Sequence, residues 1–263
     1  MNRHDAVSRT HGALENGHVM RIPTILFAAA SFALVSGCAY YIPPSGRADL
    51  ANISSPSMQE SFAAKPAAVF PARIAAVHVQ QSGYHDYYTE REGGVYGHGR
   101  YSVITAKEAE DEADLERLSR LPQVGGLVTI STLLLPSNLE SDRPMREAAA
   151  RLKADMVLFY TFNTTFHNND ASVALKVVTL GLSPTRRVVV HVAATALLID
   201  TRTGFVYAAL EANEKRQFTS NAWESRQSAD RARREAEKAA FKSLAGEFEK
   251  SWPQVIERAK QGA

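Results

Sequence analysis

Apolar and polar residues alternate over several stretches of the chain, and this two-residue period predicts β-strands. The clearest stretch is Asp155–His167, an uninterrupted segment in which both alternating sets of positions are largely apolar. Residues 200–204 separate two later stretches and predict a hairpin turn, because Gly204 can adopt a positive φ. The predicted strands are 73–80, 126–135, 155–167, 187–199 and 205–215.

Helical spacing of apolar residues appears in three other stretches. Residues 107–121 predict a charged helix that Pro122 ends, and a second helix begins at Ser141 or Asp142 and runs to about residue 153. Ser228 is predicted to cap a long last helix, which Pro253 kinks or restarts. Its arginine-rich start, 226–234, is typical of a solvated face. The predicted buried face of this helix contains Ala232, Ala236, Ala240, Leu244, Phe248 and Trp252.

The order of these elements predicts an α/β fold. We expect a single mixed sheet with helices packed on it and a long C-terminal helix. Two segments do not fit this pattern. Residues 83–101 are rich in glycine and tyrosine and predict a long loop or irregular hairpin, and the apolar stretch 173–182 is ambiguous.

Composition limits the class of protein. The 263 residues have 45% hydrophobic and 22% charged residues, which is ordinary for a folded domain. Without residues 1–37, which contain three arginines and two acidic residues, 27 basic and 26 acidic residues are left. This balance gives no electrostatic reason to expect nucleic-acid binding. The single cysteine, Cys38, means that the fold depends on packing rather than on intramolecular disulfides.

The surroundings of Cys38 predict its role. Residues 25–35 form an uncharged apolar run of about 11 residues, too short to span a bilayer but typical of a signal peptide. The following sequence, Leu34-Val35-Ser36-Gly37-Cys38, resembles the lipobox of bacterial lipoproteins. The resemblance implies cleavage before Cys38 and a covalent lipid on its sulfur, with no other cofactor expected. Ala39, by the same resemblance, implies the periplasmic face of the outer membrane. The alternative is a soluble periplasmic protein with a free cysteine.

These features divide the chain into three parts. Residues 1–37 are predicted to be a signal peptide whose true start is Met20, because Met20-Arg21 directly precedes the apolar run. Residues 38–72 are predicted to be the lipidated cysteine and a flexible tether rich in proline, serine and alanine. The alternative for this segment is that it wraps the domain through Tyr40, Tyr41 and Ile42. Residues 73–263 are predicted to be a single α/β periplasmic domain.

Three local patterns occur together in that domain. A helix ending in Leu152-Lys153-Ala154-Asp155 leads directly into an apolar strand, residues 200–204 place D-x-x-T-G at a hairpin, and an Ala/Glu/Lys-rich helix follows. Over about residues 72–250 this order resembles the periplasmic domain of the curli-secretion lipoprotein family and related small envelope lipoproteins. The resemblance implies structural roles for both aspartates, and an envelope assembly, secretion or stress role without enzyme activity. Long amphipathic hairpins that line a membrane channel in the curli proteins have no counterpart here, so we do not expect a pore.

Candidate chemistry is concentrated in the loop 83–101. Two histidines and a carboxylate, His85, Asp86 and His98, are candidate metal ligands if the loop folds back on itself. The competing interpretation is packing, because the spacing matches no familiar metal site. Nucleophile-elbow, zincin and Walker motifs are missing from the sequence. We therefore expect no catalytic residues and no bound metal.

A second candidate surface is the apolar stretch 173–182 with the arginines that follow it. Such a segment can contact a membrane interface or a partner protein, and the alternative is an ordinary core segment. The sequence thus favours a membrane-anchored, non-enzymatic binding or assembly module of the cell envelope that contacts the bilayer through Cys38 and binds an envelope protein or a second copy. The alternative is an envelope hydrolase or metal-dependent enzyme using loop 83–101. The candidate interaction residues are Val177, Leu180, Leu182, Arg186 and Arg187.

Overall fold

The computed structural model describes residues 44–54, 56–170, 186–219 and 226–262. The chain divides into two compact units, residues 1–40 and 41–263, and all described residues belong to the second unit. Cys38, the predicted signal peptide and Tyr40–Ile42 lie outside the described residues, so the predictions made for them stay predictions. Within the described part, no helix is both long enough and apolar enough to cross a membrane.

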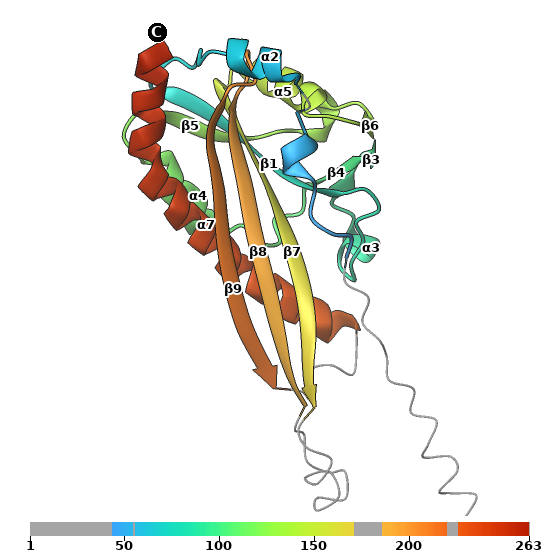
Figure 1. Cartoon of the computed structure of the whole chain (residues 1–263). Helices are drawn as coiled ribbons and strands as arrows, with labels where there is room; N and C mark the ends of the chain where they lie inside the picture. Colours follow the sequence, from blue (N-terminus) through green and yellow to red (C-terminus); the bar gives the residue numbers. More distant parts are fainter. Residues whose placement is uncertain (1–43, 55, 171–185, 220–225, 263) are drawn as a thin grey trace, which may run out of the picture. The chain divides into compact units, whose positions relative to one another are not determined.

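The predicted fold class is confirmed: a mixed seven-stranded sheet has helices packed on it, with a long C-terminal helix (Figure 1). Its order is β2-β4-β1-β7-β8-β9, and β5 also pairs with β1. The strands are β1 (Ala72–Gln81), β2 (Val95–Tyr96), β4 (Tyr101–Ile104), β5 (Val124–Thr129), β7 (Met156–Asp170), β8 (Arg186–Asp200) and β9 (Val206–Thr219). A separate two-stranded sheet contains β3 (His98–Gly99) and β6 (Asn138–Leu139). The helices are α2 (Met58–Ala63), α3 (Thr89–Glu92), α4 (Glu112–Ser119), α5 (Arg143–Arg151) and α7 (Arg226–Gly262), with 3-10 turns η2 (Leu50–Asn52) and η3 (Thr132–Leu134).

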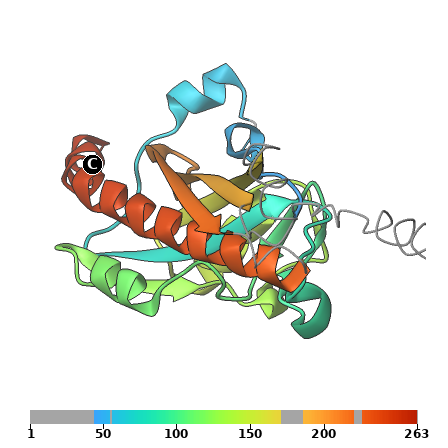
Figure 2. The ribbon, with the colours of Figure 1, turned by 90° about the horizontal axis from the view of Figure 1, so that it is seen from below.

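Both faces of the sheet are covered, which explains why β7 is apolar on both sides. Leu158, Tyr160 and Phe162 pack with α7 on one face, while Val157 and Phe159 pack with α5 and the N-terminal segment on the other. Figure 2 shows α7 lying across the sheet. The predicted buried face of this helix is confirmed, because all six of its residues are buried: Ala232, Ala236, Ala240, Leu244, Phe248 and Trp252.

The hairpin between β8 and β9 follows the D-x-x-T-G pattern. Oδ1 of Asp200 accepts hydrogen bonds from the backbone N–H groups of Arg202 (2.8 Å) and Thr203 (3.0 Å), and Gly204 has a φ of 75°. Arg202 also reaches Asp155, with Nη1 3.3 Å from its Oδ1. The aspartates of the two sequence motifs are thus tied together at one end of the sheet, where both have structural roles.

Two predicted elements are shorter than expected. Residues 107–111, predicted as the first turns of a helix, precede α4, and Asp111 caps that helix by accepting from the N–H of Ala113. The physical reason is that Glu108 and Glu110 each reach a different buried partner, which a helical backbone would prevent. The strand predicted over 126–135 ends at Thr129, because the chain turns into η3 after Ser131 accepts from the N–H of Leu133.

The predicted flexible tether is wrong for the described residues 44–71. Ala48 and Ile53 are buried, the N–H of Ala48 donates to Oγ1 of Thr161 (2.9 Å), and the N–H of Asp142 donates to the carbonyl of Ile53 (2.9 Å). This part of the segment wraps the domain. The predicted cap at Ser228 is also wrong, since α7 is already helical from Arg226.

Candidate functional site

The structure separates the three candidate metal ligands of loop 83–101. His85 and His98 are exposed, and their Nδ1 atoms contact the carbonyls of Gly83 and Ser137 respectively. Asp86, in contrast, is buried and contacts Arg233. Among the described residues, no group of three or more His, Cys, Asp or Glu side chains is placed to hold a metal ion.

Asp86 belongs instead to a buried charge network centred on Arg233, a side chain with 0% exposure. Its guanidinium contacts four carboxylates and a tyrosine hydroxyl from three separate segments of the chain. The partners are Asp86 (3.2 Å), Glu108 (2.8 Å), Asp230 (3.4 Å), Glu237 (2.6 Å) and Tyr84 (2.9 Å). The network therefore joins loop 83–89 and segment 106–111 to the first turns of α7.

In this network one arginine contacts four carboxylates. Burial raises the pKa of Glu108, and the attraction of Arg233 offsets that effect only in part. Burial also raises the pKa of Tyr84, so its hydroxyl stays protonated and can accept a hydrogen bond from the guanidinium. Burial disfavours the charge on Arg233, but the surrounding carboxylates outweigh it and raise the pKa of the guanidinium.

A second buried network lies next to the first and shares segment 106–111 with it. Glu110 accepts a hydrogen bond from the hydroxyl of Tyr160 (2.6 Å), and its Oε1 lies 3.2 Å from Nδ1 of His78. The His78 ring stacks on Tyr160 at 5.0 Å. Burial opposes ionisation of Glu110, but the contacts with His78 and Tyr160 outweigh it and lower the pKa of the carboxyl.

This second network extends through the sheet. Nε2 of His78 lies 3.3 Å from Nε2 of Gln80, whose Oε1 accepts from the hydroxyl of Thr161 (3.0 Å). Thr161 in turn accepts from the N–H of Ala48. These contacts lie beyond Val77 and Phe159, the last pair of residues at which β1 and β7 are paired in the sheet. They place the two ring nitrogens of His78 within 3.2 Å of Glu110 and 3.3 Å of Gln80.

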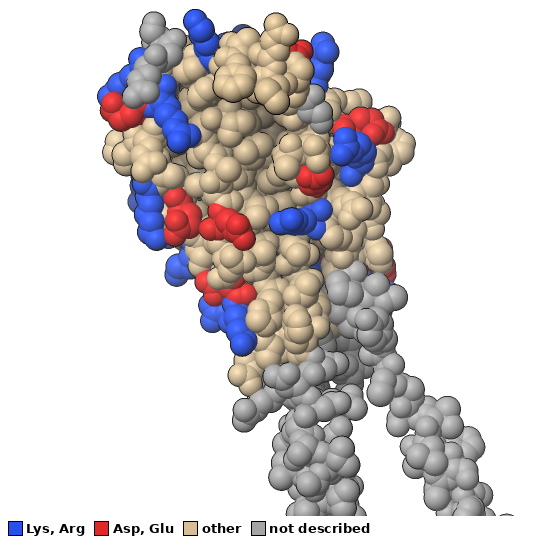
Figure 3. Space-filling view, in the orientation of Figure 1, with Lys and Arg blue, Asp and Glu red and all other residues tan. Residues whose placement is uncertain are grey.

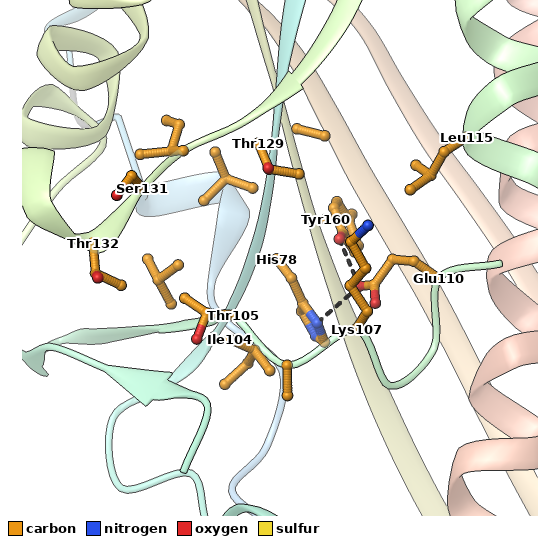
Figure 4. A pocket seen from close by; sticks show the side chains of 15 residues that line it. His78, Ile104, Thr105, Lys107, Glu110, Leu115, Thr129, Ser131, Thr132 and Tyr160 are labelled. Carbon is orange, nitrogen blue, oxygen red and sulfur yellow. Dashed lines mark hydrogen bonds and ion pairs between the residues drawn. The ribbon is translucent and has the colours of Figure 1, made fainter. Parts of the chain in front are cut away.

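The His78 network forms the floor of a cavity of about 310 Å³ (Figure 4). Hydroxyl side chains from other segments line it, including Thr105, Thr129 and Ser131. The volume lies at the lower end of the range for small-molecule sites. The cavity thus combines the contacting pair His78 and Glu110 with hydroxyl groups, a lining that suits a small polar molecule.

A different surface is exposed at α2. Its N-terminus is closed by a capping box between Ser57 and Glu60, yet none of its six described residues is buried. Met58 and Phe62, four residues apart and therefore on one side of the helix, are 78% and 86% exposed. An open groove of about 1160 Å³ lies between α2, α5 and the β8–β9 turn. On the face seen in Figure 3, acidic and basic side chains are interspersed without a large area of one sign.

The predicted interaction residues fall largely outside this description. Val177, Leu180 and Leu182 are not among the described residues, and Arg186 and Arg187 are placed only as the first backbone positions of β8. That interaction surface stays a prediction.

Sequence reasoning missed the Arg233 network, because residues 226–234 were interpreted as a solvated face. The signal was present in the helical spacing. Arg233 lies four residues after the buried Ala229 and three before the buried Ala236, so it falls on the apolar stripe of α7. An arginine on such a stripe must be paired, and four acids within reach of it are the partners.

Comparisons with known proteins do not assign a family. No protein-family model matches the chain, and a search of curated proteins finds no match.

Proposed function

We propose that the protein is a lipid-anchored, non-enzymatic binding or assembly module of the cell envelope. Cys38 would carry the lipid at the periplasmic face of the outer membrane, and the domain would bind another envelope protein or a second copy. The lipobox-like sequence supports the anchor. The single observation that carries the binding role is the pair Met58 and Phe62, two large apolar side chains exposed together on α2.

Exposed apolar pairs are costly unless something covers them in the working state. Isolated apolar side chains are common on protein surfaces, but Met58 and Phe62 lie together on one side of α2. The open groove lies on the other side of this helix, where Glu60, Ser61 and Ala64 line it. Methionine and aromatic side chains are also enriched at protein interfaces. The chemistry of the Met58 and Phe62 side of α2 fits an apolar surface of a protein partner packed against it.

The enzyme alternative has weaker support. It needs His85, Asp86 and His98 to converge on a substrate, whereas the two histidines contact separate backbone carbonyls and Asp86 is held by Arg233. The buried charged groups Arg233 and Glu110 belong to networks that join segments of the fold.

The test is site-specific photocrosslinking in the native envelope. A photoreactive amino acid at Phe62 is expected to give a discrete crosslinked product, which Met58→Asp abolishes. The matched control is Leu133, which is 93% exposed and lies on η3. Size measurement of the product separates a second copy from a different protein. A lipidated protein that stays monomeric, with equal crosslinking from positions 62 and 133, refutes the binding role.

The anchor has its own test. Cys38→Ser is expected to abolish the mass increase from acylation and to release the protein from outer-membrane fractions. Unchanged mass and fractionation in that variant would contradict the lipoprotein assignment and favour the alternative of a protein with a free cysteine.

A further inference from the structure

We propose that the surface formed by α3 and the first turns of α7 lies against the bilayer and binds its anionic phospholipid headgroups. We call it the Tyr–Arg surface and define it by Tyr87, Tyr88, Arg91, Arg231 and Arg234. The inference rests on the proposed lipid anchor at Cys38. It adds which face of the domain meets the membrane and what chemistry that face recognises.

The first argument is the length of chain between the anchor and the domain. Five residues, 39–43, lie between Cys38 and Pro44, where the described chain begins. Even fully extended, the six Cα-to-Cα steps from Cys38 to Pro44 span only about 20 Å. A lipid on Cys38 would therefore keep the headgroup layer within that distance of Pro44, and the face of the domain that carries Pro44 would face the membrane.

The second argument is what lies around Pro44. Ser45 donates a hydrogen bond to the carbonyl of Gln81 (2.8 Å), and a small hollow joins Pro44 to Tyr84 and Glu237. Both of these side chains belong to the segments that carry the Tyr–Arg surface. In Figure 1 the described chain begins well below α2. A short anchor would thus bring the Tyr–Arg surface to the bilayer and leave α2 facing away from it.

The third argument is the chemistry of the surface. The guanidinium of Arg234 lies 4.4 Å from the ring centre of Tyr88, and that of Arg91 lies 5.4 Å from the ring centre of Tyr87. The two rings contact each other edge to face at 5.3 Å. Tyrosine is enriched where proteins meet the membrane interface, and a guanidinium held on a ring presents its N–H groups to a phosphate.

The charge of this surface also fits an anionic layer. Arg91 and Arg231 are exposed, and Arg226 pairs with Glu90 at its edge (2.8 Å). Residues 87–92 and 226–234 together have four arginines outside the buried network and two exposed glutamates, Glu90 and Glu92. The remaining charged residues of these segments, Asp230 and Arg233, are buried in the network described above.

That network fixes the surface in place. Oδ1 of Asp86 accepts from the N–H groups of Tyr88 (2.7 Å) and Thr89 (2.9 Å), and Asp230 accepts from the N–H of Tyr87. Because Asp86 and Asp230 also contact Arg233, the two tyrosines that precede α3 and the arginines of α7 are held in one arrangement. A preorganised surface loses less conformational entropy when it binds.

The experiment uses the full lipidated chain in vesicles. Cys38 is occupied by lipid, so a new cysteine can be labelled alone. Gln227→Cys places a fluorophore beside the Tyr–Arg surface, and Ala63→Cys places it on α2; both native residues are uncharged and exposed. In vesicles of phosphatidylethanolamine and phosphatidylglycerol with a headgroup quencher, we expect strong quenching at position 227 and little at 63.

Charge removal tests the headgroup contact. Arg91→Gln with Arg231→Gln is expected to lower the ratio of docked to undocked domain by about 25-fold, about fivefold for each arginine. Arg143→Gln with Arg151→Gln, at exposed positions of α5, is the matched control and should leave quenching unchanged. Equal quenching at 227 and 63, or undiminished quenching at 227 in pure phosphatidylcholine vesicles, overturns the inference. In both cases flotation with the vesicles shows that the anchor is intact. Failure to float, with an unmodified Cys38, is instead failure of the proposed anchor, and the inference falls with it.

Discussion

Replacing Arg233 with methionine should be among the most destabilising single changes in this domain. The substitution keeps much of the side-chain volume but removes the guanidinium that contacts the four buried carboxylates around it. Removing one partner of a buried ion pair typically costs about 3–5 kcal/mol. Because a domain of this size is stable by only about 5–15 kcal/mol, the loss is a large share of the total.

The loss should depend on pH with a defined sign. Arg233 favours the ionised form of Glu108, whose pKa burial raises, so the stability that this pair provides is present at neutral pH and is lost as the pH falls and Glu108 binds a proton. In the variant, burial acts on Glu108 without the offsetting attraction of Arg233, so this carboxyl binds its proton more tightly than in the native protein. We therefore expect the full deficit near pH 7 and a clearly smaller one near pH 4.

Urea unfolding followed by circular dichroism measures this loss at both pH values. At neutral pH the expected loss corresponds to a fall in the melting temperature of about 10 °C. Arg231→Met, in the same turn of α7 but exposed, is the matched control and should change stability by less than about 0.5 kcal/mol. A loss below about 1 kcal/mol for Arg233→Met, or a deficit that grows on acidification, would refute the account of the network.

Three further changes test other parts of the fold. Glu110→Gln should lower the free energy of unfolding by about 1–3 kcal/mol at pH 7, because it weakens the contact with His78. Since the pKa of Glu110 is lowered in the folded protein, this loss should disappear as the pH falls through that pKa. Urea titration at pH 7 and pH 3 measures the difference. Glu108→Gln should gain stability relative to the native protein as the pH rises from 4.5 to 8, because burial raises the pKa of Glu108; an opposite slope in the same titration contradicts this. Gly204→Ala should cost about 1–2 kcal/mol in thermal unfolding, since φ is 75° and the new Cβ would lie 3.0 Å from Nη1 of Arg146; an unchanged melting temperature would count against strain in this turn.

The parts of the fold that could be predicted from sequence are those where the local pattern and the tertiary environment agree. β7, the β8–β9 hairpin and the buried stripe of α7 are long, periodic segments whose faces differ in polarity. Their partners are adjacent strands or one helix, so a period of two or 3.6 residues was sufficient. The D-x-x-T-G turn was recognisable because Asp200 bonds to its own neighbours.

The parts that could not be predicted depend on contacts distant in sequence. Glu108 and Glu110 look like residues of a solvated helix, but their partners lie more than 30 residues away, in α7 for Glu108 and in β1 and β7 for Glu110. Residues 44–71 look like a tether because proline, serine and alanine dominate them. Their docking depends on a few contacts, such as those of Ala48 and Ile53, that composition does not reveal.

The docking of residues 44–53 also has a consequence for the order in which the chain folds during synthesis. Ala48 hydrogen-bonds to Thr161, and Ile53 accepts from Asp142, so each contact waits for a segment made about 90 to 110 residues later. This stretch therefore emerges before its partners and is among the last parts of the domain to reach its place. Its contacts with β7 and with the start of α5 form only after most of the sheet has been made.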